Sequence, residues 1–105
     1  MAEFNNVSIA KAANILFEGN ITSRTIVFED NSRKTLGIML PGEYELNTVH
    51  KEVIDIQRGV LEVMLPAQDW VKYEGPASFE VPAISKFKLR VHSLVDYCCS
   101  FIKIH

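Results

Sequence analysis

Apolar and polar residues alternate in several short runs of this chain, and each run ends at a turn signal. The alternation is clearest at residues 61–65, 78–81 and 86–92. A period of two is that of a β-strand with one buried and one solvated face. Turn signals such as Pro41-Gly42 and Arg58-Gly59 separate the runs. This pattern predicts an all-β sandwich or barrel, and closing a barrel removes strand edges that would otherwise invite aggregation.

The length and composition fit one folded domain. The chain has 105 residues, of which 48% are hydrophobic and 23% are charged, and these fractions are ordinary for a globular protein. A chain of this size builds one hydrophobic core. Neither a linker nor an internal repeat is present in the sequence. We therefore expect a single barrel domain over residues 13–105, preceded by an N-terminal extension over residues 1–12.

One stretch near the N-terminus has helical rather than strand spacing. Ser8 is a candidate N-cap, and Gly19-Asn20 would end the helix early. The pattern predicts a short N-terminal helix, with apolar residues at one face: Ile9, Ala12, Ala13, Leu16 and Phe17.

Charge and hydropathy exclude several classes of partner. The formal net charge is -2 and the basic residues are scattered, whereas a nucleic-acid-binding surface needs a basic face or stripe. No apolar run approaches the roughly 20 residues that span a bilayer, and the N-terminus lacks a signal-peptide pattern. The adjacent Cys98 and Cys99 cannot form a disulfide framework. We expect a cytoplasmic protein that binds neither nucleic acid nor membranes.

A spacing of two glycines around a glutamate resembles the first motif of the cupin barrels. Gly42 is followed by Glu52, and Gly59 stands seven positions after that glutamate. The histidines of the cupin motif are missing, because their positions fall on Leu46 and Thr48, or on Glu45 and Asn47 with the longer spacer. The same glycine and glutamate spacing can also arise from an ordinary turn, strand and turn.

The second cupin motif has lost its metal ligand too. Metal-binding cupins carry a histidine five residues after the motif's proline, and here Phe87 occupies that position after Pro82. His50 is close in sequence but out of register, so Glu52 is the only ligand retained. Because a metal site needs several converging ligands, we predict that the protein uses no metal.

A longer resemblance covers most of the chain. Residues 7–28 and 33–101 are similar to the small cupin-type pyrimidine/purine nucleoside phosphorylases. The motifs that carry it are GIMLPGEYELNT at 37–48, GVLEVMLP at 59–66, DWVKYEGPASFEVPAISKFKLRV at 69–91 and YCCSF at 97–101. The resemblance implies a cupin-like (double-stranded β-helix, or jelly-roll) barrel that forms a homodimer. It also implies cleavage of purine and pyrimidine nucleosides by inorganic phosphate, a co-substrate, to free base and pentose 1-phosphate, with no cofactor.

Two adjacent cations are candidates for phosphate binding. A guanidinium offers a planar fork of donors to phosphate oxygens, so Arg33 is the first choice and Lys34 the second. A basic residue recurs at Arg33 in the resembling family. The alternative is that residues 31–34 form a solvated turn.

Two polar residues are candidate catalytic groups. Glu52 could accept hydrogen bonds from ribose hydroxyls or stabilise the positive charge that develops on the sugar. Tyr44 could hydrogen-bond the base or the phosphate. The alternatives are an exposed glutamate at the start of a strand and a core or rim tyrosine with a satisfied hydroxyl.

Three aromatic residues are candidates for holding the nucleoside, since every base offers a π-face. Phe87 stands where a metal-binding cupin has its histidine, so its side chain could face the barrel interior. Tyr97 and Trp70 are the others, although each could equally fill the barrel or cap its end.

The two cysteines and the remaining histidines are not expected to take part in catalysis. Cys98 and Cys99 point to opposite faces of any strand that carries them, and neither has an adjacent histidine base. His92 is expected on a solvated strand face, and His105 lacks partners at metal-ligand spacing. A cupin-like protein that binds a nucleoside or sugar without catalysis, and a purely structural dimerising barrel, remain open as alternatives.

Overall fold

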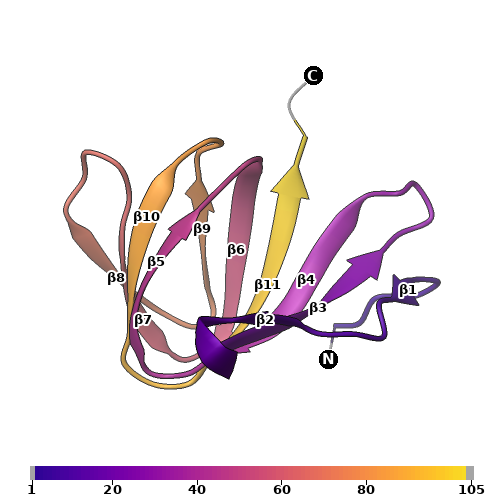
Figure 1. Cartoon of the computed structure of the whole chain (residues 1–105), viewed down its shortest axis with the longest axis horizontal. Helices are drawn as coiled ribbons and strands as arrows, with labels where there is room; N and C mark the ends of the chain where they lie inside the picture. The colour runs from indigo at the N-terminus through magenta and orange to yellow at the C-terminus, as the bar shows by residue number, and fades with distance from the viewer. Residues whose placement is uncertain (1, 104–105) are drawn as a thin grey trace.

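Two antiparallel β-sheets face each other in the computed structural model, which describes residues 2–103 (Figure 1). The larger sheet runs in the order β1 (Ser8–Ile9), β3 (Ile21–Val27), β4 (Arg33–Met39), β11 (Val95–Ile102), β6 (Lys51–Arg58) and β9 (Ala77–Val81), and β2 (Asn14–Leu16) also pairs with β3. The smaller sheet runs in the order β5 (Gly42–Asn47), β10 (Lys86–Val91), β7 (Val60–Met64) and β8 (Trp70–Glu74). The predicted all-β fold and single domain are confirmed.

The boundary predicted between residues 12 and 13 stays a prediction. Strand β1 lies inside the predicted extension, and it pairs with the outer edge of β3 through Ser8↔Val27 and Ile9↔Ile26. His105 lies outside the described residues.

The period-two alternation of the sequence becomes the inner faces of the two sheets. Leu61 and Val63 of β7 and Leu89 and Val91 of β10 are almost completely buried. They pack in one cluster with residues of the larger sheet: Ile54, Ile56, Phe79, Val81, Val95 and Tyr97. Burial of this apolar surface is the main force that holds the two sheets together.

Aromatic contacts join the two sheets at both sides. Tyr73 of β8 stacks on Phe79 of β9, with ring centroids 4.9 Å apart. At the other side, Phe17 lies in the 3-10 turn η1 (Phe17–Gly19) and its ring contacts Tyr44 of β5 at 4.9 Å. Strand β2 and this turn therefore cross between the β3 and β5 edges (Figure 1). The barrel is thus closed on one side by direct packing and on the other by an N-terminal segment.

The helix predicted near the N-terminus is wrong. Its residues form β1, β2 and η1, and Ile9 and Leu16 are exposed rather than buried along one face. A helix of this length nucleates poorly in water, whereas pairing with β3 satisfies the backbone polar groups. Within residues 2–103 the structure has no helix long and apolar enough to cross a membrane.

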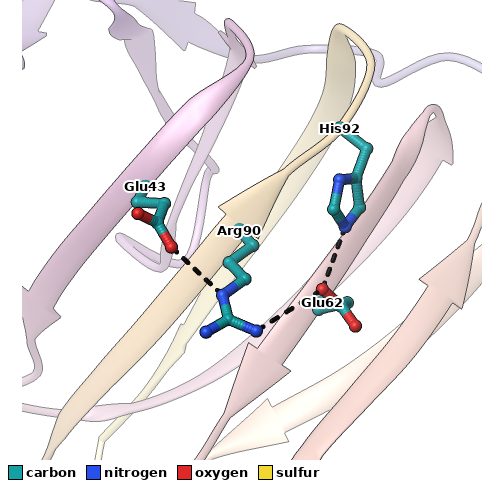
Figure 2. A network of polar contacts seen from close by, with 4 residues as sticks. All are labelled: Glu43, Glu62, Arg90 and His92. Carbon is teal, nitrogen blue, oxygen red and sulfur yellow. Dashed lines mark hydrogen bonds and ion pairs between the residues drawn. The ribbon is translucent and has the colours of Figure 1, made fainter.

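The outer face of the smaller sheet carries a row of alternating charges (Figure 2). Arg90 Nε lies 3.1 Å from Glu43 Oε1, and its Nη1 lies 3.9 Å from Glu62 Oε2. His92 Nε2 contacts the same Glu62 oxygen at 3.0 Å, and the Arg90 guanidinium lies 3.9 Å from the centre of the Trp70 ring. Exposed pairs of this kind contribute about 0–1 kcal/mol each. They follow the strand register, in which Arg90 pairs with both Glu43 and Glu62, and His92 is exposed on this solvated face.

Candidate active site

A cavity of about 1020 Å³ lies between the inner face of the larger sheet and strands β5 and β10. This volume is at the upper end of the roughly 300–1,000 Å³ found for small-molecule sites. Apolar walls come from residues such as Met39, Leu46, Ile54 and Phe87. Polar groups come from the β3–β4 turn, from the start of β6 and from the inner face of β3. A mostly apolar pocket with a few placed polar groups is the usual form of a ligand site.

The strand register places the polar groups in rows across the larger sheet. Phe101 of β11 pairs with Glu52 of β6 on one side. On its other side β11 pairs with β4, where Ser100 is opposite Lys34, so the next position along the ladder brings Phe101 opposite Arg33. Arg33 and Glu52 therefore flank Phe101, two strand spacings or about 10 Å apart at the backbone. No ion pair joins them or engages Arg33 elsewhere within residues 2–103. A cation and an anion thus face one cavity without neutralising each other.

Glu52 shares the cavity wall with a buried thiol. Cys99 Sγ donates a hydrogen bond to Glu52 Oε1 at 3.4 Å. Burial raises the pKa of Glu52, while the Cys99 hydrogen bond and the charge of His50 act in the opposite direction. Burial also raises the pKa of Cys99, and the charge of Glu52 adds to the effect. The pair therefore consists of a thiol that stays protonated and a carboxylate whose ionisation is disfavoured.

Tyr97 lies deeper in the cavity, in the next inward position of β11 after Cys99. Its side chain is 6% exposed, and burial raises its pKa to about 12. Gly37 pairs with Tyr97 across the sheet, and a Cβ built on Gly37 would lie 2.8 Å from the tyrosine hydroxyl. The glycine therefore provides the space in which the tyrosine ring lies.

Sequence reasoning missed the polar part of the cavity wall that β2, β3 and β4 contribute. Asn14 Nδ2 donates to Ser23 Oγ at 3.2 Å and to Thr25 Oγ1 at 3.1 Å. All three residues line the cavity, as does Thr35, which pairs with both Thr25 and Cys99. The available signal was the run of four polar residues in the β3 sequence ITSRTIV, in which Ser23 and Thr25 stand at alternate positions.

Four of the residues singled out from the sequence line this cavity: Arg33, Glu52, Phe87 and Tyr97. They come from β4, β6, β10 and β11, so only the fold brings them together. Their individual roles stay predictions.

The other three candidates, Lys34, Tyr44 and Trp70, do not line this cavity. Lys34 points to the outer face, with its Nζ 5.4 Å from the Phe4 ring centre and 5.9 Å from that of Phe28. Tyr44 is a core residue whose hydroxyl donates to the Leu40 carbonyl oxygen at 2.6 Å. Trp70 lies beneath Arg90 on the outer face of the smaller sheet. Lys34 points outward because successive side chains of a strand point to opposite faces, and the neighbouring Arg33 faces the cavity.

The residues of the cupin metal motif do not reassemble from other parts of the chain. Within residues 2–103, no group of three or more histidine, cysteine, aspartate or glutamate side chains is close enough to hold a metal ion. His50 and Glu52 both line the cavity, but the Glu52 side chain has a thiol rather than an imidazole as its partner.

Two antiparallel sheets around an open, partly polar cavity define a cupin-like barrel with a candidate ligand site. A solved cupin domain from Schizosaccharomyces pombe has the same fold, with a TM-score of 0.62 at 15% identity over 79% of this chain and 66% of that one. The family model described as pyrimidine/purine nucleoside phosphorylase matches residues 11–101. The chain belongs to that family, which confirms the resemblance recognised in the sequence.

Relatives match over nearly their whole length. A protein of Chlorobium chlorochromatii named pyrimidine/purine nucleoside phosphorylase is 54% identical over 97% of this chain and 99% of its own. A protein of Geotalea uraniireducens with the same name is 52% identical over 97% and 99%. A solved structure of a protein of unknown function from Acinetobacter has a TM-score of 0.90 and 31% identity, covering 95% of this chain and 98% of that one.

Proposed function

We propose that the protein is a nucleoside phosphorylase of broad base specificity, which cleaves purine and pyrimidine nucleosides with phosphate. The observation that supports this most is the placement of Arg33 and Glu52 on one cavity wall, unpaired with each other and separated by about two strand spacings. Relatives that carry the phosphorylase name cover almost the full chain. The site offers the Arg33 guanidinium to an anionic co-substrate and the Glu52 carboxylate to a sugar.

Phosphate binds at Arg33 in this proposal. Arg33 is the first residue of β4 and lines the cavity, and the planar donors of its guanidinium match phosphate oxygens. Arg33 pairs with Val27 of β3, and Thr25 lies two residues before Val27 and pairs with Thr35. The Thr25 hydroxyl is therefore the diagonal neighbour of Arg33 across the β3–β4 ladder. It adds a neutral donor beside the cation. Asp30 lies in the same turn, and its Oδ1 accepts hydrogen bonds from the Ser32 backbone N–H and hydroxyl, so part of its negative charge is engaged.

The sugar binds at Glu52, and the base binds against the aromatic side of the cavity. The Glu52 carboxylate accepts hydrogen bonds from ribose hydroxyls and, when ionised, stabilises positive charge on the sugar ring. Phe87 on the facing sheet and Tyr97 beneath it offer apolar and π surface to the base. Few directional contacts to the base would explain acceptance of both purines and pyrimidines.

The reaction then follows from positioning and electrostatics. A phosphate oxygen forms a bond to the anomeric carbon as the bond between that carbon and the base nitrogen breaks, and the bonding electrons leave with the base. The base takes a proton from solvent, and the other product is the pentose 1-phosphate. Holding the reactants in contact replaces an unfavourable bimolecular encounter. We propose that no metal and no cofactor take part, and that phosphate is the co-substrate.

We also propose that the protein is a cytoplasmic homodimer. Exposed apolar residues of β1, β2 and β4, among them Ile9, Ile15 and Leu36, line a groove of about 490 Å³ on the outer face of the larger sheet. Leu36→Glu should therefore yield monomers in sedimentation analysis. Val71→Glu, at a similarly exposed residue outside this groove, should leave the dimer intact. The free thiols of Cys98 and Cys99 fit a reducing compartment.

The activity is tested by incubating chelator-treated protein with uridine or inosine, with and without phosphate, and measuring free base by chromatography. Release of base only with phosphate is the expected result. Release without phosphate would identify a hydrolase instead, and saturable nucleoside binding without release would identify a binding protein.

Two adjacent cations provide a matched control for the phosphate site. Arg33→Ala should raise the KM for phosphate at least about 10-fold, because a charge-assisted hydrogen bond contributes about 1.5–3 kcal/mol. Lys34→Ala removes the same charge from the opposite face of the same strand and should leave this KM unchanged. Equal effects of the two changes would contradict the assignment.

A further inference from the structure

The thiol of Cys99 is a buried reactive group that phosphorolysis as described above does not use. Cys99 is 4% exposed and Cys98, next to it, is 5% exposed, but they face opposite sides of β11. Cys99 lines the cavity and contacts Glu52, whereas Cys98 is absent from the cavity wall. The two thiols are thus matched in chemistry and burial and differ in what they touch.

The hydrogen bond between Cys99 and Glu52 involves only one of the two carboxylate oxygens. Cys99 Sγ lies 3.4 Å from Glu52 Oε1, within the range of a sulfur hydrogen bond. Glu52 Oε2 has no hydrogen-bond or ion-pair partner from the described part of the chain. Since burial and the neighbouring carboxylate both raise the pKa of Cys99, the thiol keeps its proton and acts as the donor. One carboxylate oxygen is therefore held by the protein while the other is available to a ligand.

We propose that Cys99 is a positioning residue that acts through Glu52, by holding Oε1 with its S–H so that Oε2 faces the sugar of the bound nucleoside. The inference rests on the sugar-binding role of Glu52 in the proposed function. It deepens that function by assigning the two carboxylate oxygens different partners. The thiol forms no bond with substrate and needs no oxidant.

Few other groups can perform this task. Glu52 pairs with Phe101 on β11 and with Val81 on β9, and both are apolar. His50 is the nearby titratable group of the β5–β6 loop, and its charge lowers the pKa of Glu52. Tyr97 lies further along β11, and Glu52 contributes to raising its pKa. Lys51 is turned to the outer face, where its Nζ pairs with Glu80 Oε1 at 3.1 Å. Cys99 is thus the hydrogen-bond donor that reaches the carboxylate from within the described residues.

The experiment compares Cys99→Ala and Cys99→Ser with the matched changes Cys98→Ala and Cys98→Ser. Steady-state kinetics are measured separately in nucleoside and in phosphate, across pH. Cys99→Ala should lower kcat/KM for the nucleoside about 3- to 10-fold, the size of one neutral hydrogen bond. The KM for phosphate should not change, and Cys99→Ser, which restores a donor, should recover most of the loss. Neither Cys98 change should alter the kinetics.

A second measurement does not depend on activity. The side-chain carboxyl carbon of Glu52 is followed by NMR as a function of pH in each variant. Loss of the thiol donor should move the titration midpoint upward in Cys99→Ala, because the hydrogen bond favours the ionised form. The Cys98 variants should titrate as the wild type does.

The outcomes separate this inference from the proposed function. An unchanged Glu52 midpoint in Cys99→Ala overturns the positioning role, and so does an equal loss of kcat/KM in the two alanine variants, which would indicate packing alone. If the wild type releases no base with phosphate, the proposed function fails. The NMR titration then still decides whether Cys99 holds the carboxylate.

Discussion

Replacing Gly37 with alanine should destabilise the protein strongly, because the larger sheet leaves no room for a side chain there. A Cβ at this position would overlap the Thr22 carbonyl oxygen and would lie 2.8 Å from Ser23 Cβ and 2.8 Å from the Tyr97 hydroxyl. The first contact is with backbone of the paired strand β3, so it cannot be relieved by a rotamer change. Thr22 and Gly37 lie in adjacent positions of the β3–β4 ladder, and relief would require the two strands to separate.

The size of the effect follows from the kind of contact. Inserting a methyl group into a packed interior costs about 1–3 kcal/mol, and more where the backbone cannot move. We therefore expect a loss of about 3 kcal/mol or more from the free energy of unfolding. For a domain of this size each kcal/mol lowers Tm by roughly 4–8 °C. The expected fall in Tm is then at least about 12 °C, measured by circular dichroism during heating.

Two further variants make the test decisive. Gly19 has a positive φ of 96°, but no atom lies within 4 Å of the place that an alanine Cβ would take, so Gly19→Ala should cost only the strain of about 1–2 kcal/mol. Combining Gly37→Ala with Tyr97→Phe removes the hydroxyl contact and leaves the backbone contact, so the double variant should stay destabilised. A Tm for Gly37→Ala within about 3 °C of wild type, less than 1 kcal/mol, would refute the reasoning.

Three other changes test the placement of individual side chains. Tyr44→Phe removes the hydrogen bond to the Leu40 carbonyl oxygen and should cost about 0.5–1.5 kcal/mol in urea unfolding; a change in kcat or in either KM would contradict its position outside the cavity. Phe87→Leu keeps an apolar side chain in the wall but removes the ring, so the KM for both uridine and inosine should rise while the KM for phosphate stays constant. Glu52→Gln should stabilise the fold at neutral pH. Because burial raises the pKa of Glu52 in the folded state, the ionised carboxylate is unfavourable there above that pKa, and the cost disappears near the ordinary glutamate value of about 4.3. The Tm difference between Glu52→Gln and wild type should therefore shrink from pH 7 to pH 4, and a constant difference would contradict a pKa raised by partial burial.

The alternation of apolar and polar residues predicted several strands of the fold. The alternations at 61–65, 78–81 and 86–92 correspond to β7, β9 and β10, because each of these strands has one buried and one solvated face. The helical spacing near the N-terminus misled for a related reason. Its apolar residues do not share one buried face, because the Phe17 ring packs against Tyr44 whereas Ile9 is exposed. The spacing alone cannot distinguish such separate surroundings from one continuous face.

The candidate site was only partly predictable. Glu52 and Phe87 were found from the spacing of a degraded motif, and both line the cavity. Lys34 and Tyr44 were equally plausible by residue type, yet one faces outward and the other lies in the core. Asn14 and Thr25 were missed, because residue type alone does not show which face of a strand a polar side chain occupies.

The sequence by itself determined that this chain forms one all-β domain, that it belongs to the nucleoside phosphorylase family and that the cupin metal ligands are replaced. These properties depend on residue type and spacing along the chain. Only the tertiary structure decided which side chains meet, since Arg33, Glu52, Phe87 and Cys99 come from four different strands. Their meeting depends on strand order and register, and a shift of one residue in register would turn each of them to the opposite face.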